Sequence, residues 1–140
     1  MPPIVATERV GTAALSLSLP AQPVNVAVIR QAMTGVAESL EISSAVLADI
    51  NMAVTEACTN VILHAYPDGS GRFEVDVWPN GRQVDVIVSD NGSGFMPRPM
   101  QKDTSWRLGL PLIAALTDGL EVTSGPEGHG TIVRMTFDLR

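Results

Sequence analysis

One flank of a segment near the middle of the chain carries three polar side chains at helical spacing. Glu56, Asn60 and His64 follow one another at intervals of four, so a helix would stack them one turn apart. No lysine or arginine lies in residues 44–66 to pair with them. A carboxylate, an amide and an imidazole arranged in this way resemble the wall of a site, with Glu56 as a candidate catalytic group and Asn60 as a candidate ligand contact. An ordinary solvated helix face is the alternative.

Two glycine-containing segments could bring the backbone close to a ligand. Asp90 ends a predicted strand and is followed by Gly92 and Gly94, which permit close approach or a positive φ. The Asp90 carboxylate could accept a hydrogen bond from an amino group. Gly109 and Leu110 precede a predicted helix, whose first N–H groups can bind phosphate. The alternatives are a plain strand-ending turn and an ordinary helix start.

A third point of close approach is expected where Gly128 and Gly130 precede Thr131. Glycine allows two backbone segments, or a backbone and a ligand, to come together there. A simple hairpin loop is the alternative, and we expect His129, between the two glycines, to be an exposed loop residue.

The composition is that of an acidic globular protein. With 140 residues, of which 45% are hydrophobic and 17% charged, we expect one domain over 1–140, with 1–7 as a loose end. A net charge of −6 argues against direct nucleic-acid binding, although an acidic surface can meet a basic protein partner. The single cysteine, Cys58, excludes an internal disulfide and is expected to be a buried, inert thiol. No run of 18 apolar residues and no leader pattern occur, so we expect a cytoplasmic protein without a membrane span.

Hydrophobic periodicity predicts the elements that position these groups. Alternation of apolar and polar residues predicts five strands, over 9–19, 73–78, 84–88, 120–124 and 131–139. Spacings of three and four predict helices over 24–40, from a Ser43 or Ser44 cap to about 66, and from 109 to 119, with a loop over 96–107. This order predicts an α+β fold, in which three helices cover one face of a mixed, mainly antiparallel sheet.

The order and spacing of these motifs resemble a known family. The motifs are Glu-x-x-x-Asn on a helix, Asp-x-Gly-x-Gly after a strand, Gly-Leu at a helix start and Gly-Thr opening a strand. Together they resemble the Bergerat-type ATP-binding sandwich of histidine kinases and type II topoisomerases. The resemblance extends from about residue 15 to residue 137. It is closest to the anti-sigma factor serine/threonine kinases, whose N box looks like residues 56–66 here.

The resemblance implies a role for each residue that would hold the base of ATP. Asp90 would accept a hydrogen bond from the adenine amino group, and Thr131 would support it through water. Gly92 and Gly94 would let the purine lie against the backbone.

The resemblance also implies how the phosphates would be handled. Asn60 would coordinate the Mg²⁺ that bridges the phosphates, because Mg²⁺ favours a few protein oxygens together with phosphate oxygens. Gly109 and Leu110 would present their amides to the phosphates. Glu56 would take the proton from a serine hydroxyl on a protein substrate, since a general base must come within about 3 Å of the group it deprotonates.

The function implied is an anti-sigma regulatory factor that phosphorylates a serine on a STAS-type anti-sigma antagonist and sequesters a sigma factor. Members of that family commonly form homodimers. One departure is Arg107, which stands where the family's Gly-x-Gly-Leu box has its first glycine. A second is the short segment over 96–106, where the family has an ATP lid. The alternative function is therefore a non-catalytic protein-binding module in which nucleotide binding is weak or lost.

Overall fold

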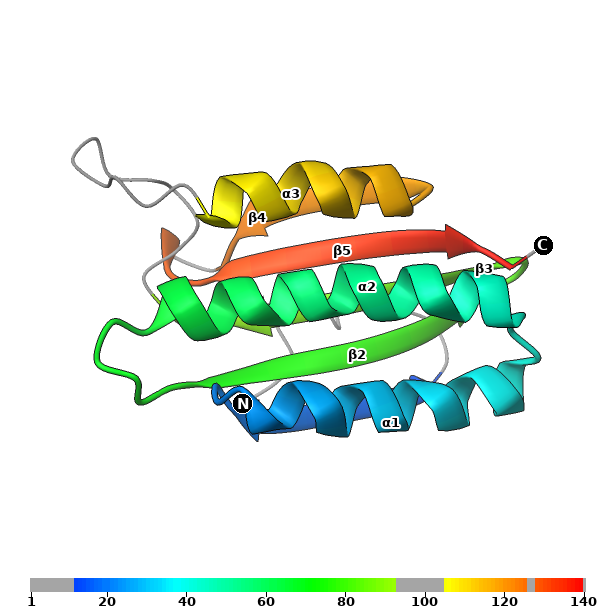
Figure 1. Cartoon of the computed structure of the whole chain (residues 1–140), viewed down its shortest axis with the longest axis horizontal. Helices are drawn as coiled ribbons and strands as arrows, with labels where there is room; N and C mark the ends of the chain where they lie inside the picture. Colours follow the sequence, from blue (N-terminus) through cyan, green and yellow to red (C-terminus); the bar gives the residue numbers. More distant parts are fainter. Residues whose placement is uncertain (1–11, 93–104, 126–127, 140) are drawn as a thin grey trace.

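The computed structural model describes residues 12–92, 105–125 and 128–139, and for 105–109 it describes the backbone only (Figure 1). The predicted order of strands and helices is confirmed. The elements are β1 (Leu15–Pro20), α1 (Val24–Leu40), α2 (Ser44–Asn60), the π-helix η2 (Val61–Ala65), β2 (Arg72–Asn80), β3 (Gln83–Asp90), α3 (Ser105–Leu116), β4 (Gly119–Ser124) and β5 (Thr131–Asp138). The expected loose end at 1–7 and the first residues of the expected strand over 9–19 lie outside the described residues.

The five strands form one sheet in the order β1-β2-β3-β5-β4. Every pairing among the described strands is antiparallel, so the α+β class is confirmed without the parallel component of a mixed sheet. Figure 1 shows α1, α2 and α3 side by side over one face of this sheet. The β2–β3 hairpin pairs Asn80 with Gln83, and Gly81 adopts a φ of 64°, which a two-residue turn of this kind favours.

The core lies between the helices and the sheet and is mainly aliphatic, as the composition predicts, although its two largest fully buried side chains are Phe73 and Phe137. The period of two in the strands sends alternate side chains toward the helices. The side chains with less than 2% exposure include Met33 of α1, Ile50 and Val54 of α2, and Val75, Val86 and Met135 of the sheet.

The central helix begins as predicted. The Ser43 hydroxyl caps α2 by accepting a hydrogen bond from the Val46 N–H at 3.2 Å. By length and composition alone, Ser44–Ala65 could cross a membrane, with 22 residues and a mean hydropathy of 1.3. Its apolar stripe instead packs in the core, where Ile50, Val54 and Cys58 are almost fully buried. It is therefore the core helix of this fold.

The third helix differs from the prediction. It begins at Ser105, four residues before the predicted start at Gly109, and ends at Leu116, while Gly119 opens β4. The prediction used Pro111 as a sign of a first helical turn. The structure places Pro111 inside the helix. The helix tolerates it at the loss of one backbone hydrogen bond, because proline has no N–H to donate.

The opposite face of the sheet carries a buried polar cluster. The Asp85 carboxylate is fully buried and accepts hydrogen bonds from Arg134 Nη2 at 3.0 Å and Thr136 Oγ1 at 2.8 Å. The Ser16 hydroxyl donates to the buried Asp76 carboxylate at 2.5 Å. Period-two alternation identifies these as the polar positions of their strands, and cross-strand pairing gives them partners.

Candidate functional site

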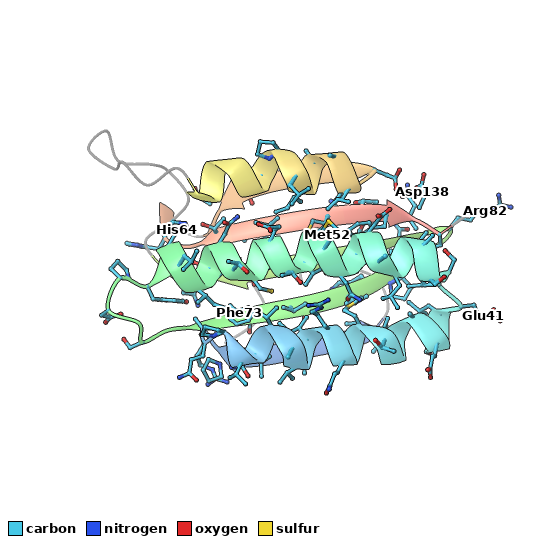
Figure 2. The ribbon with its side chains drawn as sticks, in the orientation of Figure 1. Glu41, Met52, His64, Phe73, Arg82 and Asp138 are labelled. Carbon is cyan, nitrogen blue, oxygen red and sulfur yellow. The ribbon has the colours of Figure 1, made fainter. Side chains whose placement is uncertain are left out.

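The two candidate residues of the central helix occupy its last turns. Glu56 and Asn60 are both half-buried, and Asn60 is the last residue of α2. Residues four apart on an α-helix are neighbours on one face, so the carboxylate and the amide lie on the same flank. Figure 2 shows Met52, one turn before Glu56, on the side of α2 nearer to α3.

Beyond Asn60 the helix changes its winding. Val61–Ala65 forms a π-helix, in which hydrogen bonds join residues five apart instead of four. This winding changes the angle between Asn60 and His64 from the one that a continuous α-helix would give. Figure 2 shows His64 on the side of this segment nearer to α3. The widened turn was missed by sequence analysis, because the apolar spacing through 65 fits an α-helix equally well.

Asp90 and Thr131 are brought together by the sheet. Asp90 is the last residue of β3 and Thr131 the first of β5, and they are direct partners in the antiparallel register. Asp90 lies two residues after the core residue Val88, so its side chain points to the helix-covered face, as does that of Thr131, two residues before Val133. Asp90 is 5% exposed, whereas Thr131 is half-buried. A carboxylate and a hydroxyl thus meet at the sheet end beneath η2.

Burial sets the electrostatics of Asp90. It raises the pKa of the carboxyl above its usual range, while backbone N–H groups of Gly92 and Thr131 lower the pKa by donating to the ionised form. The hydrogen bond from Gly92 N to Asp90 Oδ1 is 2.8 Å long. An ionised carboxylate only accepts hydrogen bonds, so what this group can recognise is a donor such as an exocyclic amino group.

Glycine allows two close approaches around Asp90. A Cβ on Gly92 would lie 2.2 Å from the Ala65 carbonyl oxygen, so the loop after β3 packs directly on the end of η2. A Cβ on Gly130 would lie 2.1 Å from the Asp90 carbonyl oxygen, and the Gly130 N–H donates to the Gly92 carbonyl at 3.0 Å. These approaches join protein segments to each other. Gly128 has no such protein neighbour, since nothing lies within 4 Å of a Cβ built there, and glycine is favoured at that position by its φ of 77°.

Sequence analysis missed the part that Tyr66 plays. Its hydroxyl accepts a hydrogen bond from the Asn91 N–H at 3.0 Å and donates to the Arg72 carbonyl at 2.5 Å. Its ring lies against Gly71, where a Cβ would be 2.2 Å from the Tyr66 Cδ1. The available signal was that the only tyrosine of the chain follows the central helix directly.

Three predicted residues of the nucleotide site remain to be placed. Gly94 lies outside the described residues. Gly109 and Leu110 fall in the second turn of α3, because that helix begins at Ser105. In an α-helix the N–H of the fifth residue bonds to the carbonyl of the first, so the amides of Gly109 and Leu110 are not the free N-terminal amides that were predicted.

The described residues contain no group of three or more His, Cys, Asp or Glu side chains that could hold a metal ion by themselves. Mg²⁺ is commonly bound by one or two protein oxygens together with substrate phosphates and water. Asn60, at the end of α2, fits a site of that kind.

Comparison with known proteins places this chain in a family. The chain belongs to the histidine kinase-like ATPase domain family, whose match covers residues 19–137. The predicted resemblance is thereby confirmed at the level of the family.

Individual proteins and solved structures show which members of this family the chain resembles. The chain is 28% identical over 135 residues to proteins named serine-protein kinase RsbW from Bacillus thuringiensis and Bacillus anthracis, and each match covers 87% of this chain and 82% of the relative. A structure of the RsbU and RsbW domains of a Mycobacterium tuberculosis protein contains a similar fold, with a TM-score of 0.71 and 23% identity over 89% of this chain and 32% of that one. The SiaB–SiaC complex of Pseudomonas aeruginosa gives a TM-score of 0.65 and 15% identity, over 89% and 91%.

Proposed function

We propose that this protein binds Mg-ATP and transfers phosphate to a serine of a protein partner, as an anti-sigma regulatory kinase. The observation that carries the proposal is the buried Asp90 carboxylate, which is paired with Thr131 and held under the end of the helix that bears Glu56 and Asn60. Membership of the ATPase family and similarity to serine-protein kinases of the RsbW type support it.

The residues at the sheet end fit an adenine base. The Asp90 carboxylate, fixed by the Gly92 N–H, would accept a hydrogen bond from the adenine amino group. The Thr131 hydroxyl, directly opposite in the register, would support this contact through water. Gly92 packs on Ala65 without a side chain, and this holds the loop after β3 against the helix end. Gly94, by the family resemblance, would let the purine lie against the backbone.

The residues on the helix flank fit the transfer step. Asn60 would supply a side-chain oxygen to Mg²⁺. The bound metal ion would neutralise phosphate charge, which is most of what phosphoryl transfer requires beyond positioning. Glu56, one turn before Asn60, would accept the proton of the attacking serine hydroxyl and orient that oxygen.

The proposed protein partners are inferred from the similarity to serine-protein kinases of the RsbW type. We propose a STAS-type anti-sigma antagonist as the phosphorylated protein, a sigma factor as a second, sequestered partner, and a homodimer in the cytoplasm as the working form. The net charge of −6 suits contact with basic patches on protein partners rather than with nucleic acid.

Phosphate transfer from labelled Mg-ATP to a panel of STAS domains tests the proposal. Glu56→Gln should reduce the rate by about 10²- to 10⁴-fold while leaving ADP affinity unchanged, because a general base acts in the transition state. Asn60→Ala should abolish the Mg²⁺-dependent part of nucleotide binding. Asp49→Asn, an exposed acidic position on the same helix, is the matched control and should leave both unchanged. Full activity in both the Glu56 and the Asn60 variants would refute these roles.

A second candidate is a binding module without kinase activity. Arg107 at the first position of the glycine box favours it, as does the helical conformation of Gly109 within α3. Under this alternative, Arg107→Gly should raise nucleotide affinity by freeing the backbone at that position. Unchanged affinity in this variant would remove Arg107 as the explanation.

A further inference from the structure

A single hydroxyl joins three segments that meet at the proposed nucleotide site. Tyr66 follows the π-helix η2, and its Oη accepts the Asn91 N–H from the loop after β3 and donates to the Arg72 carbonyl at the start of β2. Asn91 lies between Asp90 and Gly92, the two residues that form the base-facing part of the site. The Tyr66 hydroxyl is therefore hydrogen-bonded to the backbone of that loop, although Tyr66 itself belongs to the segment that follows η2.

The ring of Tyr66 is itself held in place. Gly71 leaves room for it, because a Cβ at that position would overlap the ring, and the Tyr66 carbonyl accepts the Gly69 N–H at 2.8 Å. Burial raises the pKa of the phenol, so the hydroxyl keeps the proton that it donates to Arg72. A fixed ring that carries both a donor and an acceptor can hold two backbone segments in register.

We propose that Tyr66 is a positioning residue of the nucleotide site. By accepting a hydrogen bond from the Asn91 N–H, it fixes the loop that orients the Asp90 carboxylate toward an adenine amino group. This inference rests on the proposed function. The π-turn of η2 is what delivers Tyr66 to this position, since it changes the winding immediately before the residue.

The anchor matters to ligand recognition more than to stability. Asn91 is exposed, so its N–H can bond to water when the hydroxyl is removed, and no buried donor is left without a partner. The side chain of Asp90, by contrast, is buried and recognises a ligand only in the orientation that its backbone gives it. Loss of the Tyr66 hydroxyl should therefore leave the orientation of the Asp90 carboxylate less well defined without unfolding the core.

The test compares Tyr66→Phe with wild type by calorimetric titration with ADP and GDP. Phenylalanine keeps the ring against Gly71 and removes only the hydroxyl. The ADP dissociation constant should rise by about 5- to 10-fold, the worth of one hydrogen bond, whereas weak GDP binding should stay unchanged because guanine lacks the amino group at that position. Ser70→Ala is the matched control: it removes a hydroxyl of the same connecting segment, which contacts Asp68 and not Asn91.

Hydrogen exchange of the Asn91 amide, measured by NMR on the same variants, separates failure of this inference from failure of the proposed function. We expect faster exchange at Asn91 in Tyr66→Phe, with an unfolding midpoint close to that of wild type and of Ser70→Ala. An unchanged ADP affinity, or an equal loss for ADP and GDP, would overturn the positioning role even if the wild type binds ADP well. If the folded wild type binds no nucleotide, the proposed function is overturned. The positioning role then falls with it, whatever rate of hydrogen exchange is measured at the Asn91 amide.

Discussion

Asp90 and Thr131 face each other across β3 and β5, although 40 residues separate them in the chain. Their side chains share the helix-covered face of the sheet, and the carboxylate is almost fully buried there. A buried carboxylate is costly unless hydrogen bonds satisfy it. Here the N–H groups of Gly92 and Thr131 provide part of that compensation. Under the proposed function, this acceptor-only group would accept a hydrogen bond from the adenine amino group.

Replacing Asp90 by Asn should weaken ADP binding strongly. Asparagine keeps an oxygen for the Gly92 N–H but removes the negative charge from the contact with the amino group. A hydrogen bond to a charged group is worth about 1.5–3 kcal/mol, so the dissociation constant should rise by about 10- to 100-fold. Calorimetric titration measures this change.

The exposed Asp68, which also accepts hydrogen bonds in a turn, provides the control. Asp68→Asn should bind ADP as the wild type does. Equal affinities for wild type and Asp90→Asn would remove Asp90 from the site.

Adding one methyl group at Gly92 should destabilise the fold and disrupt the site together. The new Cβ would lie 2.2 Å from the Ala65 carbonyl oxygen, which belongs to the backbone and cannot turn away as a side chain would. Overpacking of this kind costs about 1–3 kcal/mol, and urea unfolding of Gly92→Ala measures it.

Gly35→Ala is the matched glycine substitution in the same protein. Gly35 lies within α1, and nothing is found within 4 Å of a Cβ built there. Alanine should stabilise the helix by about 0.5–1 kcal/mol. A Gly92→Ala protein as stable as the wild type would contradict the contact between the loop and η2.

The raised pKa of Asp90 makes a prediction about pH. Because the folded carboxyl holds its proton to a higher pH than the unfolded one, the contribution of this group is fully present below the unfolded pKa and is lost as pH rises through the folded pKa. The free energy of unfolding of the wild type, relative to Asp90→Asn, should therefore fall as the pH rises above about 4. Urea unfolding at a series of pH values measures the difference.

ADP binding should show the opposite trend, because the amino group is recognised by the ionised carboxylate. Affinity should decrease on acidification, with a midpoint above the ordinary aspartate value of 3.8. A stability difference between wild type and Asp90→Asn that rises with pH would contradict the direction of the shift.

The thiol of Cys58 should be unreactive in the native protein. Its side chain is fully buried, and burial raises its pKa to about 12, so that almost none is thiolate at neutral pH. A chromogenic disulfide reagent should modify the urea-unfolded chain rapidly and the native chain only as fast as it opens. Rapid stoichiometric labelling of native protein, with circular dichroism unchanged, would show that the core around α2 is more open than described.

Much of the fold was predictable because the signals are local. The spacing of Ile29, Met33 and Val36 identifies α1, and the alternation through Val84 and Val86 identifies β3, since periodicity depends only on neighbouring residues. The bounds of α1 agree with the prediction, and the Ser43 cap is confirmed. The predicted start of α3 is wrong. A glycine followed by a proline is typical of a helix start, but here Gly109 and Pro111 lie inside a longer helix.

By itself, then, the sequence determined the order of the elements, the mainly aliphatic core and the residue types of the proposed site, Asp90 and Thr131 among them. Only the tertiary structure decided that these two residues are partners in the register, that Gly92 and Gly130 pack backbone on backbone, and that Tyr66 anchors Asn91. The reason is physical. Periodicity reports which face of an element is apolar, whereas strand register, a π-turn and hydrogen bonds between distant backbone segments depend on how the faces meet in space.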